Sequence, residues 1–314
     1  MGRFGFIAKR LILTVPLLLG VLLCLFLLFT VTPGDPARET VGLRASQQQV
    51  AAVRQQMHLN DPALVQYGRY VGAVARGDLG YSFKSRQPVF DMISQRLPVT
   101  IWLIGAGTLI SLLLSTPLGI LAALQHDTPI DHALRLGGLF GLAMPSFWVG
   151  LMLILLIALP TGIVPVGGFG TSVPDHVRSI FLPAVTLAIA LAPIQIRSLR
   201  ASVATVMESD YITTARSIGV PRSRLIRRFV LRNAIASTVT LMAIQIGFLL
   251  FDSVVIETTF ALPGVGQGLV LAVQQRDLPT IQGYALLFAL IVIFVYLVAD
   301  IITAILDPRV EIES

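Results

Sequence analysis

The sequence predicts an all-α, polytopic membrane protein with six transmembrane helices, and three observations lead to this prediction. Hydrophobic residues make up 55% of the 314 residues, only 13% are charged, and the mean hydropathy is +0.81. Several segments run for about 20 residues without a charge, which is the length needed to cross ~30 Å of hydrocarbon. Such segments must be helical, because a helix satisfies all of its own backbone hydrogen bonds in lipid.

Six segments have this length and character, and we expect the fourth and fifth spans to be shorter than the others. The predicted spans are residues 7–31, 99–124, 134–159, 180–199, 234–255 and 281–306. Proline inside a helix removes one backbone hydrogen bond and favours a kink. Kinks are therefore expected at Pro117, Pro145 and Pro193.

The distribution of cations sets the expected orientation, because short cytoplasmic loops are enriched in Lys and Arg. If the N-terminus is cytoplasmic, the cytoplasmic side contains Lys9, Arg10, Arg135 and the eight arginines of residues 197–232. The two short outer loops then contain only Arg178 and Arg276. Both termini are therefore expected in the cytoplasm. Since the arginines follow topology rather than form a soluble basic domain, the high pI does not indicate nucleic-acid binding.

This topology divides the chain into four parts. Residues 1–31 hold the N-terminal end and the first span, and residues 32–98 form an extracytoplasmic helical segment. Residues 99–309 form a core with five spans and two short cytoplasmic helices within residues 207–232, and residues 310–314 are a cytoplasmic tail. In the outer segment we expect helices at 47–57, 62–75 and 88–96. Its role is either to pack on the outer ends of the spans or to dock an external partner.

The polar, arginine-rich stretch 210–233 has the pattern of two short helices separated by a glycine. Ser209 or Asp210 can cap the first helix, and Tyr211, Ala215 and Ile218 follow each other at helical spacing. Gly219 stands where a glycine ends a helix, and Pro221 fits the first turn of the next one. A helix pair interrupted in this way is expected to lie along the membrane surface.

Several motifs of catalysis are missing from the sequence. There is no phosphate-binding Gly-rich loop followed by Lys, no His-Glu-x-x-His and no nucleophile elbow. The four histidines lie outside the predicted spans, and the single cysteine, Cys24, excludes an intramolecular disulfide and a cysteine metal cluster. We therefore expect a non-catalytic chain without a cofactor or bound metal.

Polar residues in and beside the fifth span are candidate functional residues, because ionisable groups at membrane depth are costly to keep there. Asp252, Glu257 and Gln245 are the candidates. A carboxylate at position 252 could attract a cationic group in a central cavity. Alternatively, Asp252 is hydrated at the helix end and Glu257 orders the loop that follows it.

Motifs along nearly the whole chain resemble those of the permease subunits of ABC importers of the dipeptide, oligopeptide and nickel family. The family's coupling motif reads Glu-Ala-Ala, three residues, Gly, nine residues, Ile-x-Leu-Pro. Ala215, Gly219 and Leu231 occupy matching positions of this motif, whereas the first Glu, the second Ala and the Pro are absent. Other matching blocks are Thr32-Pro33-Gly34-Asp35-Pro36, Gly77-Asp78-Leu79-Gly80, Arg96-Leu97-Pro98-Val99-Thr100, Pro145-Ser146-Phe147-Trp148-Val149-Gly150, Phe260-Ala261-Leu262-Pro263-Gly264 and Leu306-Asp307-Pro308-Arg309.

This resemblance implies a type I ABC-importer permease fold in a bacterial inner membrane, and the chain looks like the first of two permease subunits. The implied partners are a second homologous permease, two ATPase domains that hydrolyse ATP, an extracytoplasmic substrate-binding protein and membrane lipid. The residues implied in ATPase coupling are Asp210, Tyr211, Thr214, Ala215, Arg216, Gly219, Pro221 and Leu231.

The implied cargo is di- or oligopeptides, moved by alternating access, with nickel chelates, glutathione or oligosaccharides as alternatives. Two rival classes remain for the chain as a whole. A secondary transporter without an ATPase would have inverted repeats and paired charges at mid-membrane, and a membrane-embedded enzyme would have catalytic pairs inside its spans. Neither pattern is found in the sequence.

Overall fold

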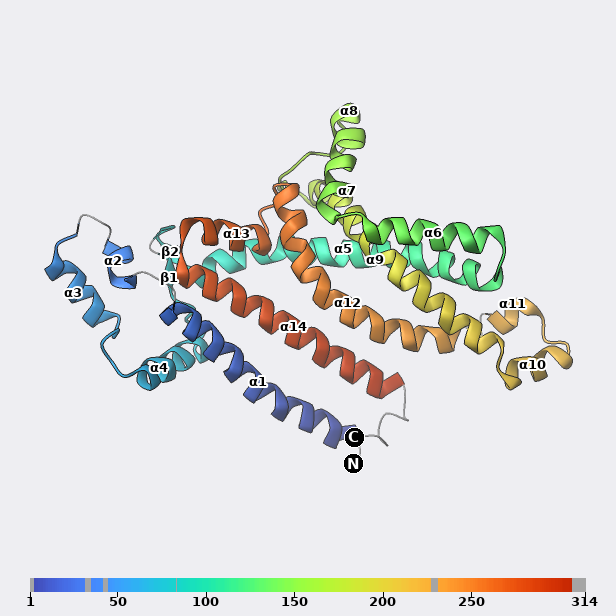
Figure 1. Ribbon diagram of the computed structural model, residues 1–314, viewed down its shortest axis with the longest axis horizontal. Coiled ribbons are helices and arrows are strands. Elements are labelled where there is room, and N and C mark those ends of the chain that lie inside the picture. Colours follow the sequence, from blue (N-terminus) through green and yellow to red (C-terminus); the bar gives the residue numbers. More distant parts are fainter. Residues whose placement is uncertain (1–2, 32–34, 42–44, 83, 227–230, 307–314) are drawn as a thin grey trace. The chain divides into compact units, whose positions relative to one another are not determined.

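The computed structural model describes residues 3–31, 35–41, 45–82, 84–226 and 231–306, and these residues are mostly helical (Figure 1). Its elements in chain order are α1 (Arg3–Val31), α2 (Pro36–Val41), α3 (Gln47–Gln56), α4 (Ala63–Ala75), β1 (Tyr81–Ser82), β2 (Gln87–Pro88), α5 (Val89–Leu124), α6 (Pro129–Ala143), α7 (Ser146–Leu153), the π-helical turn η1 (Ile154–Ala158), α8 (Leu159–Thr161), α9 (Val173–Met207), α10 (Asp210–Ser217), α11 (Arg222–Leu225), α12 (Leu231–Thr259), α13 (Val265–Gln275) and α14 (Leu278–Leu306).

The chain forms two compact units. The core unit comprises residues 1–9, 97–267 and 291–314, and the outer unit comprises residues 10–96 and 268–290. The boundary between the two units falls between Arg96 and Leu97, two residues before the division expected between residues 98 and 99. Because α5 runs without interruption through Pro98, the short helix expected at 88–96 is its first part.

Four described helices are long and apolar enough to cross a membrane, and there are five if the bent pair of α6 with α7–α8 counts as one span. These agree with the first, second, third, fourth and sixth predicted spans. The fifth predicted span lies in α12, a continuous helix of 29 residues. The side chains of residues 231–240 lie outside the described part, so six spans remain a prediction.

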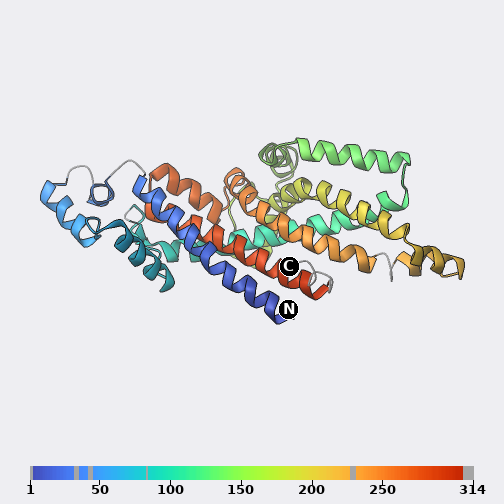
Figure 2. The same cartoon turned by 60° about the horizontal axis from the view of Figure 1, so that its bottom comes forward.

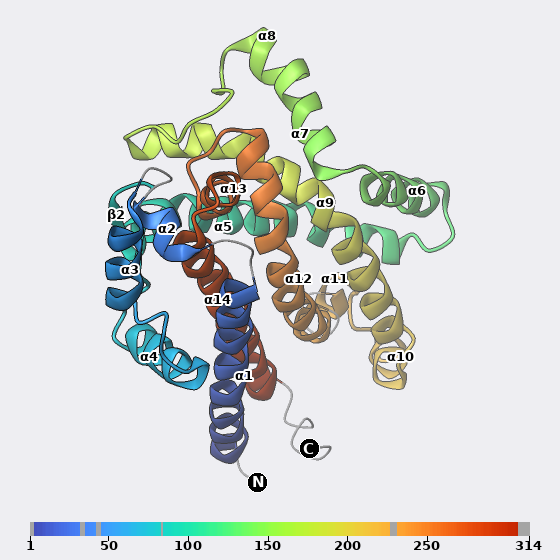
Figure 3. The same ribbon diagram turned by 60° about the vertical axis from the view of Figure 1, so that its left-hand side comes forward.

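The lengths and shapes of three spans differ from expectation. The third is not one helix: α6 ends before Pro145, and α7 starts after it at an angle of 99° (Figure 3). Pro145 lies at this break, whereas Pro117 and Pro193 lie inside helices that continue past them. The fourth and fifth spans are longer than predicted, because α9 has 35 residues and α12 has 29.

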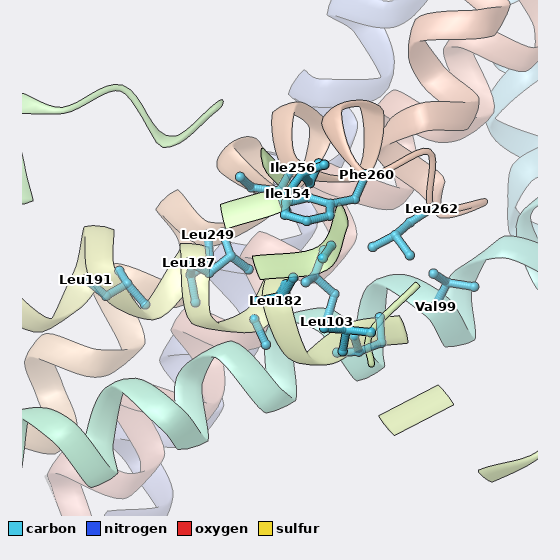
Figure 4. Packing of buried hydrophobic residues seen from close by; sticks show 14 residues of the cluster. Val99, Leu103, Ile154, Leu182, Leu187, Leu191, Leu249, Ile256, Phe260 and Leu262 are labelled. Carbon is cyan, nitrogen blue, oxygen red and sulfur yellow. The ribbon is translucent and has the colours of Figure 1, made fainter. Parts of the chain in front are cut away.

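The hydrophobic centre of the core unit is formed by side chains from α5, η1, α9 and α12 (Figure 4). Leu103 on α5 and Leu187 on α9 are fully buried in it, together with Ile256 near the end of α12. Phe260 in the turn after α12 is 1% exposed. Since lipid is as apolar as these side chains, close packing rather than removal from water makes this cluster hold together helix ends that are far apart in the sequence.

A stripe of small residues on α5 allows close approach to α9. Gly107, Ser111, Ser115 and Gly119 recur every four residues and therefore share one face of the helix. A Cβ atom at Gly107 would lie 3.1 Å from Leu187 Cβ, and one at Gly119 would lie 3.0 Å from Leu199 Cβ. Small residues at this spacing are typical of tightly packed membrane helices.

The outer unit confirms the helices predicted at 47–57 and 62–75 as α3 and α4. A capping box between Ser46 and Gln49 starts α3. At the start of α4, Pro62 occupies the cap position and no side chain caps the helix. A short antiparallel hairpin, in which Tyr81 pairs with Pro88, was not predicted. Asp277 anchors this hairpin by accepting a hydrogen bond from the Ser82 hydroxyl at 2.5 Å.

Candidate functional site

The helix pair predicted at residues 210–233 forms at the end of α9 (Figure 2). Ser209 has the extended backbone of a cap residue but makes no side-chain capping bond. Its hydroxyl donates instead to Val206 O at 2.6 Å. Asp210 starts α10 and does not cap it, although its negative charge suits the first turn of a helix. The capping role predicted for these two side chains is therefore wrong.

Gly219 ends α10 in the conformation that the sequence predicted. Its φ is +83°, a left-handed value that side chains with a Cβ disfavour. The Gly219 amide donates to Arg216 O at 3.0 Å, and the Val220 amide donates to Ala215 O at 3.1 Å. This pair of bonds is a Schellman motif. Pro221 lies just before α11 rather than inside it, and its carbonyl accepts the first bond of that helix from Arg224 N.

The inner face of α10 packs on its own chain. Ile212 is fully buried and Ala215 is 9% exposed, in a cluster with Leu199 and Val203 of α9 and Leu225 of α11. Ala215 therefore faces the α9 end rather than an outside partner. Tyr211, Ala215 and Ile218, which follow each other at helical spacing, do not share one environment. Ala215 is buried, whereas Tyr211 is 45% and Ile218 is 75% exposed.

The outer face of the helix pair consists of Tyr211, Thr214, Arg216, Ile218 and Gly219, which are all exposed. Beside it lies a cavity of about 350 Å³ lined by Met207, Arg216, Val220 and Leu225. Arg216 reaches over this cavity and donates to Met207 Sδ at 3.8 Å. The side chain of Leu231, the last predicted coupling residue, lies outside the described part of the chain.

Asp252 and Glu257 both lie inside α12, not at or beyond its end as expected. Asp252 is half-buried, and its Oδ1 accepts a hydrogen bond of 2.5 Å from the Ser146 hydroxyl at the start of α7. The carboxylate therefore lies beside the break between α6 and α7. A half-buried carboxylate at such an irregular point could attract a cation.

Glu257 is fully buried and serves the loop after α12. Its Oε1 accepts from the Thr100 hydroxyl at 2.6 Å, and its Oε2 accepts from Gln267 N at 3.0 Å. The Thr100 oxygen in turn accepts from Val265 N at 2.9 Å. At Gly264 a Cβ atom would collide with the Glu257 carboxylate. The geometry thus favours the loop-ordering alternative for Glu257 over a place in the translocation path.

Gln245 is 5% exposed and belongs to a buried polar network. Its Oε1 accepts a hydrogen bond of 2.9 Å from Gln195 Nε2 on α9. The Oε1 of Gln195 accepts from the hydroxyls of Ser111 and Ser115 on α5, each at 2.7 Å. The sequence analysis missed Gln195 and both serines. The spacing of Ser111 and Ser115 on one face of α5 was a signal that could have found the two serines.

An ion-pair cluster between α6 and α9 was also missed. Arg200 holds the fully buried Asp131 with two hydrogen bonds, Nε to Oδ1 at 2.7 Å and an Nη to Oδ2 at 2.8 Å. Arg135 lies 3.2 Å from the same carboxylate. Both arginines had been interpreted only as markers of the cytoplasmic side. Among the described residues, no group of three or more His, Cys, Asp or Glu side chains could hold a metal ion.

Comparisons with known proteins agree over nearly the whole chain. Residues 115–312 match the family described as binding-protein-dependent transport system inner membrane component, and residues 3–104 match the N-terminal part described for such membrane components. The chain is 34% identical to the oligopeptide transport system permease protein AppB of Bacillus subtilis, covering 98% of this chain and 99% of that protein. It is 37% identical to the glutathione transport system permease protein GsiC of Salmonella paratyphi A, with the same coverage of both chains.

Proposed function

The chain belongs to the family of binding-protein-dependent transport inner membrane components, and from this premise we propose that it is the first of two permease subunits in an ATP-driven importer of di- or oligopeptides. As a member of this family it is a non-catalytic, multi-pass permease of the inner membrane. A second permease, two ATPase domains and an extracytoplasmic binding protein complete the proposed importer.

One observation carries the coupling role: the unit of α10, Gly219 and α11 has an inner face packed on α9 and an exposed outer face. Such a unit can transmit force, since a partner can contact Tyr211, Thr214 and Ile218 while Ile212 and Ala215 remain anchored. ATP binding would close the two ATPase domains and displace this helix pair. Because Ile212 and Ala215 pack against Leu199 and Val203 of α9, displacement of the pair would move the end of α9 and change the packing of the spans.

Asp252 is the residue that we assign to the translocation path. Its carboxylate is half-buried beside the break between α6 and α7, and it would attract the ammonium group of a peptide. Gln245 is too deeply buried in this arrangement to meet cargo, and Glu257 is committed to the loop after α12. The cationic N-terminus common to di- and oligopeptides suits a single carboxylate of this kind.

Glutathione is the second candidate cargo, because relatives at 36–37% identity are named as glutathione permeases. Glutathione also has a free ammonium group. A free ammonium group is not a shared feature of nickel chelates or of oligosaccharides. Neither cargo is named among the relatives described above. A secondary transporter without ATPase partners remains the alternative mechanism.

Uptake measured on the reconstituted complex separates these possibilities. Proteoliposomes that contain both permeases, the ATPase domains and the binding protein should accumulate labelled trialanine only when ATP is supplied. Labelled glutathione in the same assay distinguishes the two kinds of cargo. ATP-independent accumulation driven by an ion gradient would contradict the proposal and favour the secondary transporter.

A further inference from the structure

The pair of buried glutamines, Gln195 on α9 and Gln245 on α12, joins three long helices. The exposed fractions of the two side chains are 2% and 5%. Gln195 Nε2 donates to Gln245 Oε1 at 2.9 Å, while its Oε1 accepts from the hydroxyls of Ser111 and Ser115 on α5. Both ends of the Gln195 amide and the Oε1 of Gln245 are thus bound within the protein, where a lost hydrogen bond is expensive.

The register between α5 and α9 directs the two serine hydroxyls to Gln195. Gly107 packs against Leu187, and Gly119 packs against Leu199, so Ser111 and Ser115 lie between these two contacts. Gln195 lies between Leu187 and Leu199 on α9. A serine in a helix can instead bond a carbonyl of its own helix. Here both serines donate across the helix interface, which makes Gln195 the centre of the network.

One donor of the network is left over. Gln245 Nε2 is buried and has no hydrogen-bond partner among the residues that the structure describes. A buried donor without a partner destabilises the arrangement that contains it. Among the described residues, the arrangement is therefore supported by three hydrogen bonds and opposed by one donor without a partner. An arrangement that supplied a partner for this donor would therefore recover the free energy that is lost here.

Gln195 is also close to the unit of α10, Gly219 and α11, which we call the coupling segment. It lies one helical turn before Leu199, which packs in the cluster that buries Ile212 and Ala215 of α10. α9 is continuous from Val173 to Met207, about 52 Å at 1.5 Å per residue. A displacement of α10 therefore reaches Gln195 through the contact of α10 with Leu199 and one turn of α9.

We propose that Gln195 is a positioning residue for the transport step. It holds Gln245, and with it α12, against α5 and α9 in the arrangement described here. When the coupling segment moves, Gln195 shifts relative to the two serines, and Gln245 exchanges this partner for one that satisfies its free donor. The inference rests on the proposed function, since the displacement is that of an ATP-driven importer.

The test uses the complete importer in lipid nanodiscs, with Cys24 replaced and nitroxide labels at positions 109 on α5 and 248 on α12. Both positions are exposed, at 57% and 68%. Distance distributions are recorded without nucleotide and with ATP and vanadate. Gln195→Met removes the amide at the centre of the network. Without nucleotide, we expect the ratio of the described arrangement to the alternative arrangement to fall by about fivefold to 100-fold.

A double-mutant cycle makes the result specific. Gln195→Met combined with Gln245→Met removes both amides and leaves no unsatisfied donor between them, so the population should return to within about twofold of wild type. Thr186→Val is the matched control, because its buried hydroxyl on α9 bonds Leu182 O of its own helix and no other described residue. It should leave both populations unchanged. If Gln195→Met does not assemble, Ser111→Ala with Ser115→Ala should give a shift in the same direction.

Two outcomes separate this inference from the proposed function. If the wild-type complex takes up trialanine with ATP and changes its distance distribution, but Gln195→Met leaves that distribution as it was, the positioning role is wrong and the importer function stands. If the effects of Gln195→Met and Gln245→Met on the populations simply add in the double variant, the positioning role is also wrong. If the wild-type complex shows neither ATP-driven uptake nor an ATP-dependent distance change, the proposed function itself fails.

Discussion

The hydroxyl of Thr100 on α5 donates a 2.6 Å hydrogen bond to the carboxylate of Glu257 on α12, although 157 residues separate them in the sequence. The same Thr100 oxygen accepts a hydrogen bond from Val265 N. Thr100 and Glu257 therefore connect the start of the second span, the end of α12 and the loop that follows it. This relationship identifies Glu257 as a structural residue.

Thr100→Val should destabilise the chain. It removes one donor from a buried carboxylate and the acceptor of a buried amide, so we expect a loss of about 2 kcal/mol or more in the free energy of unfolding. Thermal unfolding of the purified importer in detergent measures it. Thr108→Val is the matched control on the same helix, since the Thr108 hydroxyl has no partner among the described residues. An equal loss in both variants would contradict this assignment.

Gly219→Val should abolish coupling without preventing membrane insertion. A Cβ at a φ of +83° is strained by roughly 1 kcal/mol or more, and a β-branched residue by more than that, so the angle between α10 and α11 would change. We expect normal membrane abundance, with loss of ATPase stimulation by the binding protein and loss of uptake. Gly77→Val, at a φ of +81° in the outer unit and with open space around it, is the control for strain alone. Full stimulation in Gly219→Val would refute the coupling role.

Ala215→Glu should detach α10 from α9, because it places a charge in a cluster whose other members are apolar. Uptake should fall by at least about tenfold, and α10 should become more accessible to limited proteolysis. Ala201→Glu makes the same change at an exposed position of α9 and should behave like wild type. Had Ala215 faced an external partner, uptake would fall while the protease resistance of α10 stayed unchanged, so the proteolysis result decides between the two orientations.

Asp252→Asn should weaken uptake of peptides with a free N-terminus. Loss of one charge close to the ammonium group should raise the KM for trialanine about tenfold, with basal ATP hydrolysis unchanged. N-acetylated trialanine, which lacks that charge, should be transported equally by both proteins. Asp91→Asn, at an exposed residue outside the proposed path, is the matched control. An equal effect on free and acetylated peptides would show that Asp252 does not read the ammonium group.

The proposed topology predicts which cysteines react from each side of the membrane. In a Cys24→Ser background, Asn60→Cys should be labelled by a membrane-impermeant maleimide added outside intact cells. Arg222→Cys should react only after the membrane is opened. External labelling at position 222 would invert the orientation and place the coupling segment on the wrong side for an ATPase.

Local rules explain why part of this architecture could be predicted. Apolar length predicted the spans, and the order Gly219 then Pro221 predicted the helix pair, because both depend on residues close in the chain. The break at Pro145 was only partly predictable. A proline indicates a kink, but whether the chain bends gently or turns by 99° depends on what α6 and α7 pack against.

The sequence by itself determined the membrane character of this chain, the places of most of its helices, and the glycine turn of the coupling segment. The tertiary structure alone decided that Ala215 faces α9, that Glu257 orders a loop, that Arg200 holds Asp131, and that Gln195 binds Gln245. The physical reason is that hydropathy and backbone conformation are properties of a residue and its neighbours. The partner of a buried polar group depends on which helices meet, and at which register.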